Sequence, residues 1–126
     1  MSNARNIASI AGEDVLNASN EIVPVYACRA WVNFNGTGTV AIRASSNVSS
    51  IDDLSNSVYR VNFTTNMSDA NYAVSASGGN TSNGVPFLTT RSSNNADPNV
   101  AYIEVQGSNG GNGVADLDFA YVAIFR

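Results

Sequence analysis

Alternating apolar and polar residues, in short runs separated by loops of Gly, Asn and Ser, are the feature that most constrains the fold of this chain. The run from Tyr26 to Phe34 places every second side chain on one face, and the run from Tyr59 to Phe63 repeats this pattern. A period of two is the period of a β-strand. Such runs recur at intervals of roughly ten residues and predict an all-β chain, an antiparallel β-sandwich of jelly-roll-like form with about seven to eight strands.

The clearest hairpin is predicted from Cys28 to Arg43. Two alternating runs flank the turn Asn35–Gly38, in which glycine can adopt a positive φ. The first run carries the only Trp of the chain, Trp31, on the face opposite Phe34. Because both faces hold a large side chain, the outer face is predicted to pack under a loop or against another subunit. The last run, Leu117 to Phe125, is apolar on both faces and predicts a central or interface-buried strand.

The chain is predicted to form one domain preceded by a short segment. A length of 126 residues is typical of a single domain. In residues 1–24, apolar residues recur at helical steps and Glu13-Asp14 favours the start of a short helix, with an extended arm as the alternative. Pro24 ends this segment because the residue before a proline is pushed towards extended geometry. The β-sandwich is therefore expected over residues 25–126.

Charged residues are few, and this excludes several classes of function. Six Arg and ten Asp and Glu give a net charge of −4, without any Lys or His. Nucleic acid is not an expected partner, because phosphate binding needs clustered cations. With a single Cys, Cys28, and no His, neither an internal disulfide nor a multi-cysteine zinc site is expected, and Cys28 is predicted to be a small buried residue. We expect no cofactor, no metal and no membrane insertion, since no apolar run approaches roughly 18 residues.

Acidic residues offer the only candidates for catalysis. Asp52-Asp53, Asp69, and Asp116 with Asp118 provide carboxylates that in other settings act on glycosidic bonds or bind a divalent cation. These spacings are common, and Asp is favoured in turns for its hydrogen bonds to the backbone. The chain is therefore predicted not to be an enzyme, and a polysaccharide depolymerase is kept only as a minor alternative.

Three loops rich in Gly, Asn and Ser are the main candidates for recognition, and they fall within 77–84, 91–99 and 107–113. A rigid β scaffold that carries long polar loops is a common arrangement for binding, and plain solvated connections are the alternative. Tyr102, beside Glu104, is predicted to be exposed and suited to stacking on a sugar ring, whereas Tyr59, Tyr72 and Tyr121 lie on apolar strand faces and are predicted to pack in the core. The receptor-binding candidates in or near these loops are Thr81, Asn83, Arg91, Asn94, Asn95, Tyr102 and Asn109.

A set of short stretches carries a resemblance to a known family. They are Arg29–Thr39 (RAWVNFNGTGT), Ile42–Ser45, Asn47–Ile51, Tyr59–Thr65 (YRVNFTT), Asp69–Val74 and Val122–Arg126. Together they resemble the C-terminal domain of the tail fibre and receptor-binding proteins of tailed phages. The resemblance runs from Tyr26 to Arg126 and is densest before Val74, and none of the stretches is a catalytic motif.

The resemblance implies a virion protein at the tip of a phage tail, non-enzymatic and homotrimeric. Its expected partners are itself, other phage tail proteins, and a host cell-surface glycan or outer-membrane protein. It implies that residues 1–24 trimerise or attach the chain, and that Trp31, Phe34, Phe119 and Phe125 pack between subunits. The chain lacks the shaft and the anchoring domain of a full fibre, so a short separate fibre, an assembly partner and a fragment all fit. A structural decoration or tail-assembly protein without receptor contact is the alternative function.

Overall fold

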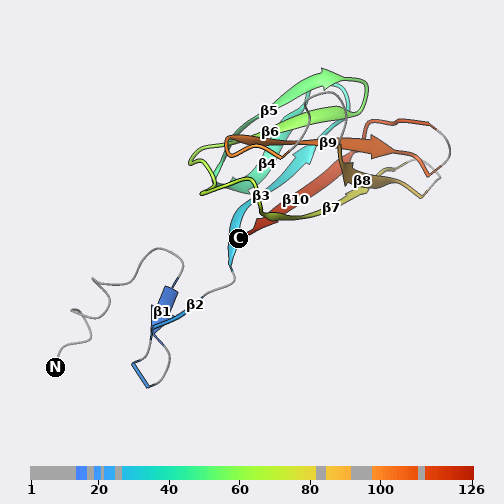
Figure 1. The fold of residues 1–126 in the computed structure, drawn as a ribbon. Coiled ribbons are helices and arrows are strands. Elements are labelled where there is room, and N and C mark those ends of the chain that lie inside the picture. The colour runs from blue at the N-terminus through green and yellow to red at the C-terminus, as the bar shows by residue number, and fades with distance from the viewer. Residues whose placement is uncertain are drawn as a thin grey trace.

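The computed structural model is all-β in the part that it describes, residues 14–16, 19–20, 22–24, 27–81, 85–91, 98–110 and 113–126. Eight of its strands form two four-stranded antiparallel sheets packed face to face (Figure 1), which confirms the predicted β-sandwich. The first sheet has the order β4-β3-β10-β7, with β3 (Cys28–Asn35), β4 (Ala41–Ser46), β7 (Ala73–Gly79) and β10 (Phe119–Phe125). The second has the order β5-β6-β9-β8, with β5 (Val48–Ser55), β6 (Val58–Phe63), β8 (Phe87–Thr90) and β9 (Tyr102–Ser108).

The hydrophobic core lies between the two sheets and follows the alternation of the sequence. Every second residue of β6 and β10 points inward, so that Val61 and Val122 are almost fully buried. Phe34 of the first sheet meets Tyr59 of the second edge to face, with ring centroids 5.2 Å apart. Burial of each large apolar side chain stabilises the fold by about 1.5–3 kcal/mol. The largest fully buried side chains are Tyr59, Phe34, Ile103, Leu117, Ile124, Val32, Val61 and Val105.

Pairing of the first and last strands of the sandwich sets the positions of the chain ends. β10 lies between β3 and β7, as predicted for a strand that is apolar on both faces. Because β3 and β10 are antiparallel, Ala27 and Arg126 meet at one end, where Arg29 Nε donates to the Arg126 carbonyl at 2.9 Å. We call this the terminal end. The opposite end, the loop end, holds the β3–β4 turn, where Gly36 N donates to the Leu117 carbonyl at 2.8 Å.

Cys28 is exposed at the start of β3, which overturns its prediction as a buried residue. Ile124 pairs with Ala30 whereas Phe125 pairs with Cys28, so a β-bulge at Arg29 adds one residue to β3. One extra residue reverses the face of every side chain on the far side of the bulge. The thiol instead donates a weak hydrogen bond to the Ala30 carbonyl at 3.2 Å.

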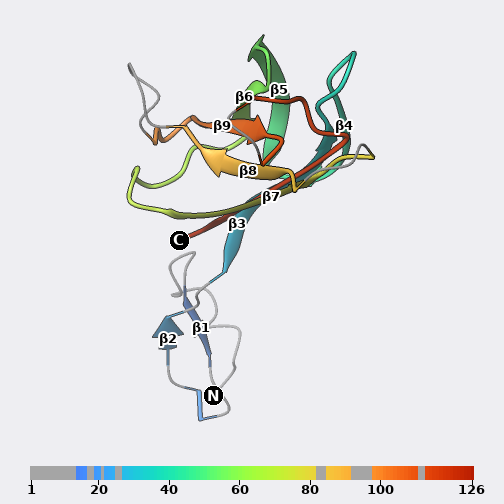
Figure 2. The same cartoon turned by 90° about the vertical axis from the view of Figure 1, so that its right-hand side faces the viewer.

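Two short strands precede the sandwich. β1 (Asp14–Leu16) and β2 (Ile22–Pro24) pair as an antiparallel hairpin, which lies apart from the sandwich in Figures 1 and 2. A strand at Asp14–Leu16 differs from the short helix that Glu13-Asp14 favoured. Asn20 between the strands has φ 61°, a left-handed conformation that suits a turn. Residues 1–13 lie outside the described part, and within that part no helix has the length and apolar character of a membrane span.

Candidate functional site

Four large aromatic side chains stand on the outer surface of the first sheet. Trp31 on β3 and Phe119, Tyr121 and Phe125 on β10 are 42%, 39%, 41% and 44% exposed. Ala120, Val122 and Ile124 alternate with the aromatic residues of β10 and fill the core. Because successive side chains of a strand point to opposite faces, the aromatic residues point outward. We call these four residues the aromatic face. Several exposed aromatic side chains on one face of a sheet make this face a candidate interaction surface.

A hollow opens on the aromatic face between Trp31 and Tyr121. The register places Ala123 between Trp31 on one side and Ser75 on the other, while Tyr121 lies between Asn33 and Ser77. Because Ala123 and Ser75 are small while Trp31 and Tyr121 beside them are large, the sheet surface is recessed there. The hollow is shallow and open, with a volume of about 370 Å³, and it is lined by Trp31, Val32, Asn33, Ser75, Ser77, Tyr121, Val122 and Ala123.

Arg43 covers one end of the aromatic face. Its guanidinium carbon lies 4.7 Å from the centroid of the Phe119 ring, which is within the range of a cation–π contact. The same guanidinium donates to the carbonyl of Phe34 at 3.0 Å and to that of Asp118 at 2.7 Å. Phe119 is therefore held in place by Arg43, whereas Trp31 and Tyr121 flank the open hollow.

The four predicted interface residues fall into two groups. Phe34 is 0% exposed and packs on Tyr59, so its side chain has no surface to offer a second subunit. It lies on the opposite face of β3 from Trp31, because side chains alternate between the two faces of a strand and the two residues are three positions apart. Phe34 is thus a core residue, and its place in the predicted interface is corrected. Trp31, Phe119 and Phe125 are accessible on the aromatic face, where an interface stays a prediction.

The predicted recognition residues do not gather into one surface. Thr81 and Asn109 are exposed near the loop end, where Thr81 donates to Asp118 Oδ2 from both its backbone N–H, at 2.7 Å, and its hydroxyl, at 2.6 Å. Arg91 and Tyr102 lie at the ends of β8 and β9 that face the terminal end. The remaining candidates, Asn83, Asn94 and Asn95, lie outside the described residues.

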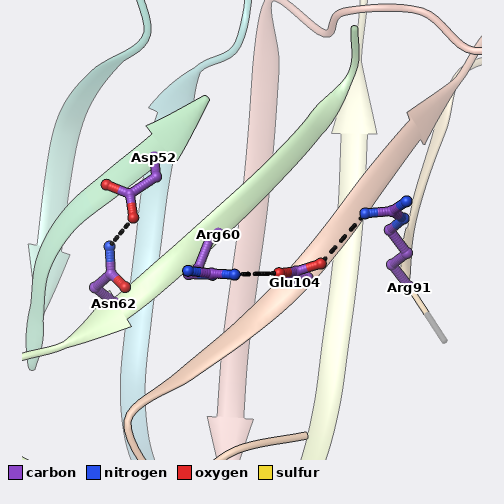
Figure 3. A network of polar contacts seen from close by, with 5 residues as sticks. All are labelled: Asp52, Arg60, Asn62, Arg91 and Glu104. Carbon is purple, nitrogen blue, oxygen red and sulfur yellow. Dashed lines mark hydrogen bonds and ion pairs between the residues drawn. The ribbon is translucent and has the colours of Figure 1, made fainter. Parts of the chain in front are cut away.

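A buried carboxylate on the second sheet accounts for Arg91 and Tyr102. Glu104 is only 4% exposed and lies between two arginines, with Oε1 2.7 Å from Arg60 Nη2 and Oε2 3.4 Å from Arg91 Nη1 (Figure 3). The hydrogen bond to Glu104 raises the pKa of Arg60. Arg60 in turn lies 4.3 Å from the centroid of the Tyr102 ring. Tyr102 is therefore half-buried under a cation, not the freely exposed ring that the sequence predicted.

Glu104→Gln should lower the free energy of unfolding by about 1–2 kcal/mol, because the variant keeps the shape but removes the charge that Arg60 and Arg91 share. The value is modest because the two guanidinium side chains are 33% and 32% exposed and water screens them. Urea denaturation at low and high salt measures the effect, and added salt should weaken the wild type more than the variant. The control is Asp52→Asn, which alters an exposed contact to Asn62; equal losses for both variants would contradict the prediction.

Asp116 ties the core to the loop end. Its Oδ1 accepts from the backbone N–H of Ser57 at 2.7 Å and lies 2.9 Å from the Tyr59 hydroxyl, which is also 2.8 Å from the Gly36 carbonyl. Burial, followed by the hydrogen bond to Asp116, raises the pKa of Tyr59. A Cβ atom at Gly36 would lie 2.5 Å from that hydroxyl, so this close approach requires glycine.

Two other acidic candidates, Asp118 and Asp69, join loops or a chain end. Asp118 accepts from Thr81 and, at 3.1 Å, from the Thr37 hydroxyl, which joins two loops. Asp69 forms an ion pair of 2.6 Å with Arg126 at the terminal end, and this hydrogen bond lowers the pKa of Asp69. In the described part of the chain, no group of three or more Cys, Asp or Glu side chains is arranged to hold a metal ion.

Asp118→Asn should weaken the fold near neutral pH and flatten its acid unfolding. Hydrogen bonds from Thr81 lower the pKa of Asp118 below its ordinary 3.8, so the carboxylate contributes stability that is complete above this value and lost as the pH falls through the lowered pKa. The expected change lies below the ordinary pKa of 3.8, measured by urea denaturation as the pH is lowered from neutral through that value. Asp53→Asn, on exposed β5, is the control. An unchanged acid profile for Asp118→Asn would contradict this prediction.

Tyr121 is the site residue that the sequence did not identify. Tyr59, Tyr72 and Tyr121 all lie on apolar runs and were predicted to pack in the core; the structure buries Tyr59 and Tyr72 but leaves Tyr121 41% exposed. The sequence did contain an indication of this, because the aromatic residues of 119–125 share the odd-numbered face while Ala120, Val122 and Ile124 share the other. The face of Ala120, Val122 and Ile124 has the smaller side chains and is the one that fits a tightly packed core.

Comparisons of the chain with protein-family models, with curated proteins and with solved structures find no match. The function proposed below therefore rests on the resemblance of the short stretches to tail fibre domains and on the geometry of the surface. That surface combines an aromatic hollow on the first sheet with hydrogen-bonded loops at one end of the sandwich.

Proposed function

We propose that this chain is a component of a phage tail fibre that acts as a host receptor-binding module at the tail tip, without enzymatic activity. The observation that carries the proposal is the resemblance of the six stretches to tail fibre C-terminal domains. In the structure these stretches contribute to β3, β4, β5 and β6, to the start of β7 and to the end of β10, which pair as neighbours within the two sheets. None of the six stretches falls in the segment from Ser77 to Gly113, which contains β8, β9 and the polar loops. A shared scaffold with a divergent recognition part suits a receptor-binding protein.

The positions of the chain ends support an orientation on the virion. β2 (Ile22–Pro24) comes shortly before β3 in the chain, and β3 begins at the terminal end, where Ala27 meets Arg126. We assign residues 1–24 to attachment to other phage tail proteins and to the homotrimer, which directs the loop end away from the virion. A host-surface glycan or outer-membrane protein would then be met by the loop end and the sides of the sandwich.

Surface chemistry also supports a binding role. The chain is poor in charge and rich in Asn, Ser and Thr, which recognise neutral polar ligands by short hydrogen bonds rather than by a long-range field. Such contacts are individually weak. Three copies on one fibre, and several fibres on one virion, would raise the effective affinity by avidity.

A structural decoration or tail-assembly protein is the second candidate. It is favoured by one observation, that Thr81, Arg91 and Tyr102 already make contacts within the chain. Residues held in this way are less available to a receptor. In that function the loops would be inert, and exchanging them between related fibres would leave host range unchanged.

Two measurements test the proposed function. Light scattering on the intact protein should give three times the chain mass of 13.2 kDa, and a stable monomer would overturn the homotrimer. The purified protein should also bind host cells and compete with virions for adsorption. If it does not bind, and virions that lack it adsorb normally, the receptor-binding function is wrong and the structural alternative holds.

A further inference from the structure

The hollow on the aromatic face combines two exposed aromatic rings with hydroxyl and amide side chains. We propose that it binds a neutral hexopyranose unit of a cell-surface glycan, stacked between Trp31 and Tyr121. This inference rests on the proposed receptor-binding function and deepens it by naming a ligand class. It also moves the recognition site from the predicted loops to the outer surface of the first sheet.

The register of β3 and β10 positions the two rings for one ligand. Trp31 pairs directly with Ala123, and Tyr121 lies two residues further along the same strand, so the rings occupy diagonal positions. Diagonal neighbours in an antiparallel pair are about 7–8 Å apart and remain within reach of aromatic side chains. Ala123, half-buried between them, leaves the space that the ligand would fill. The apolar face of a pyranose ring is a suitable partner for such rings, because it covers them without leaving a polar group unsatisfied.

The rim of the hollow supplies hydrogen-bonding groups for the sugar hydroxyls. Asn33 from β3 and the hydroxyls of Ser75 and Ser77 from β7 line it, and Tyr121 adds a phenol that both donates and accepts. Of the described residues that line the hollow, none is charged; Arg43 donates to Asn33 Oδ1 at 3.5 Å from beside the hollow, but its guanidinium is already held by the Phe34 and Asp118 carbonyls. An anionic sugar would call for a cationic partner at the site, so the lining favours a neutral one.

A second copy of the chain is the competing occupant, as the predicted interface at Trp31, Phe119 and Phe125 requires. Subunit interfaces are most apolar at their centre. Here the centre of the face is recessed, and Asn33, Ser75 and Ser77 form part of its wall. A recessed centre with polar walls fits a small polar ligand better than a flat apolar partner.

Trp31 makes the proposal directly testable, because it is the only Trp of the chain and its fluorescence reports on this site alone. Acrylamide quenching of the intact protein would be measured with neutral gluco-, galacto- and manno-oligosaccharides, and with an oligogalacturonate as the anionic control. At least one neutral series should reduce the quenching constant at least twofold in a saturable manner. The oligogalacturonate should have no effect. Protection by none of the neutral series in the folded protein would overturn the proposal.

Variants on the same face provide the matched controls. Tyr121→Ala, and Ser75→Leu to fill the hollow, should each raise the apparent dissociation constant for the sugar, measured from the protection of Trp31, at least tenfold. Phe125→Ala removes an aromatic ring of similar exposure that does not line the hollow, and it should leave sugar binding unchanged. Circular dichroism confirms that each variant is folded. Equal loss in all three variants would overturn the assignment to the hollow.

Three further outcomes separate the possible failures. If a second copy covers this face, Trp31 should be protected from acrylamide without any sugar and should become quenchable on dilution of the protein. This result would overturn the glycan site. If the wild type binds host cells and Tyr121→Ala binds them equally well, the proposed function stands and the hollow is not its site. If Trp31 is protected by sugar while the protein fails to bind host cells, the site stands and the receptor-binding function is wrong.

Discussion

Phe34→Ala is expected to lower the free energy of unfolding by about 3–5 kcal/mol, the usual cost of deleting a buried phenyl ring. Phe34 is fully buried and packs edge-on against Tyr59 at the centre of the core. The substitution would remove this contact and leave a cavity between the two sheets. Urea or thermal denaturation followed by circular dichroism measures the loss.

Trp31→Ala is the matched control on the same strand. Trp31 has the larger side chain but is 42% exposed, so its removal should cost about 1–2 kcal/mol. Phe34→Ala is thus expected to cost more stability than Trp31→Ala, although residue size alone would suggest the opposite. If Trp31→Ala were as damaging as Phe34→Ala at all protein concentrations, the division between core and aromatic face would be wrong. A cost for Trp31→Ala that grows with protein concentration would instead indicate that the aromatic face lies between subunits.

Leu117→Ala is expected to lower the free energy of unfolding by about 2–5 kcal/mol. Leu117 precedes β10 and is 0% exposed. It fills the space above Gly107, where a Cβ atom would lie 3.1 Å from Leu117 Cγ, and it also contacts Gly78. Its backbone carbonyl accepts from Gly36, so Leu117 links the core to the β3–β4 turn. The expected loss therefore combines a cavity with loosening of the loop end.

The control for Leu117→Ala is Val114→Ala, a change in the same segment at a residue that is 47% exposed. This variant should stay within about 0.5 kcal/mol of the wild type. Denaturation of both variants under one set of conditions gives the comparison. Hydrogen exchange should locate the loosening at the loop end, and a loss confined to the terminal end would contradict the role given to Leu117.

Much of the fold could be predicted because alternation specifies which residues of a strand share a face. The run of 59–63 gave the inward residues Tyr59, Val61 and Phe63 correctly, and the structure buries all three. The central position of β10 also followed from its two apolar faces. Strand order could not be predicted, because β3 and β10 are far apart in sequence and no local pattern records their pairing.

The candidate site was predicted only in part. Trp31, Phe119 and Phe125 were identified as surface aromatic residues suited to a partner, but Phe34 and Tyr121 were assigned to the wrong environments. In a strand with two apolar faces, alternation separates the faces but does not say which one enters the core. Tyr102 was misjudged for another reason, since the cation that covers it comes from a different strand, β6.

By itself, the sequence determined the β architecture, the alternation of each strand and the small number of charged residues. The tertiary structure alone decided which aromatic residues are exposed, and it placed Ala123 between Trp31 and Ser75 to form the hollow. It also turned Asp116, Asp118 and Glu104 into hydrogen-bond acceptors within the chain. The physical reason is that alternation is a local property of one strand, whereas a site depends on register between strands that only the folded chain brings together.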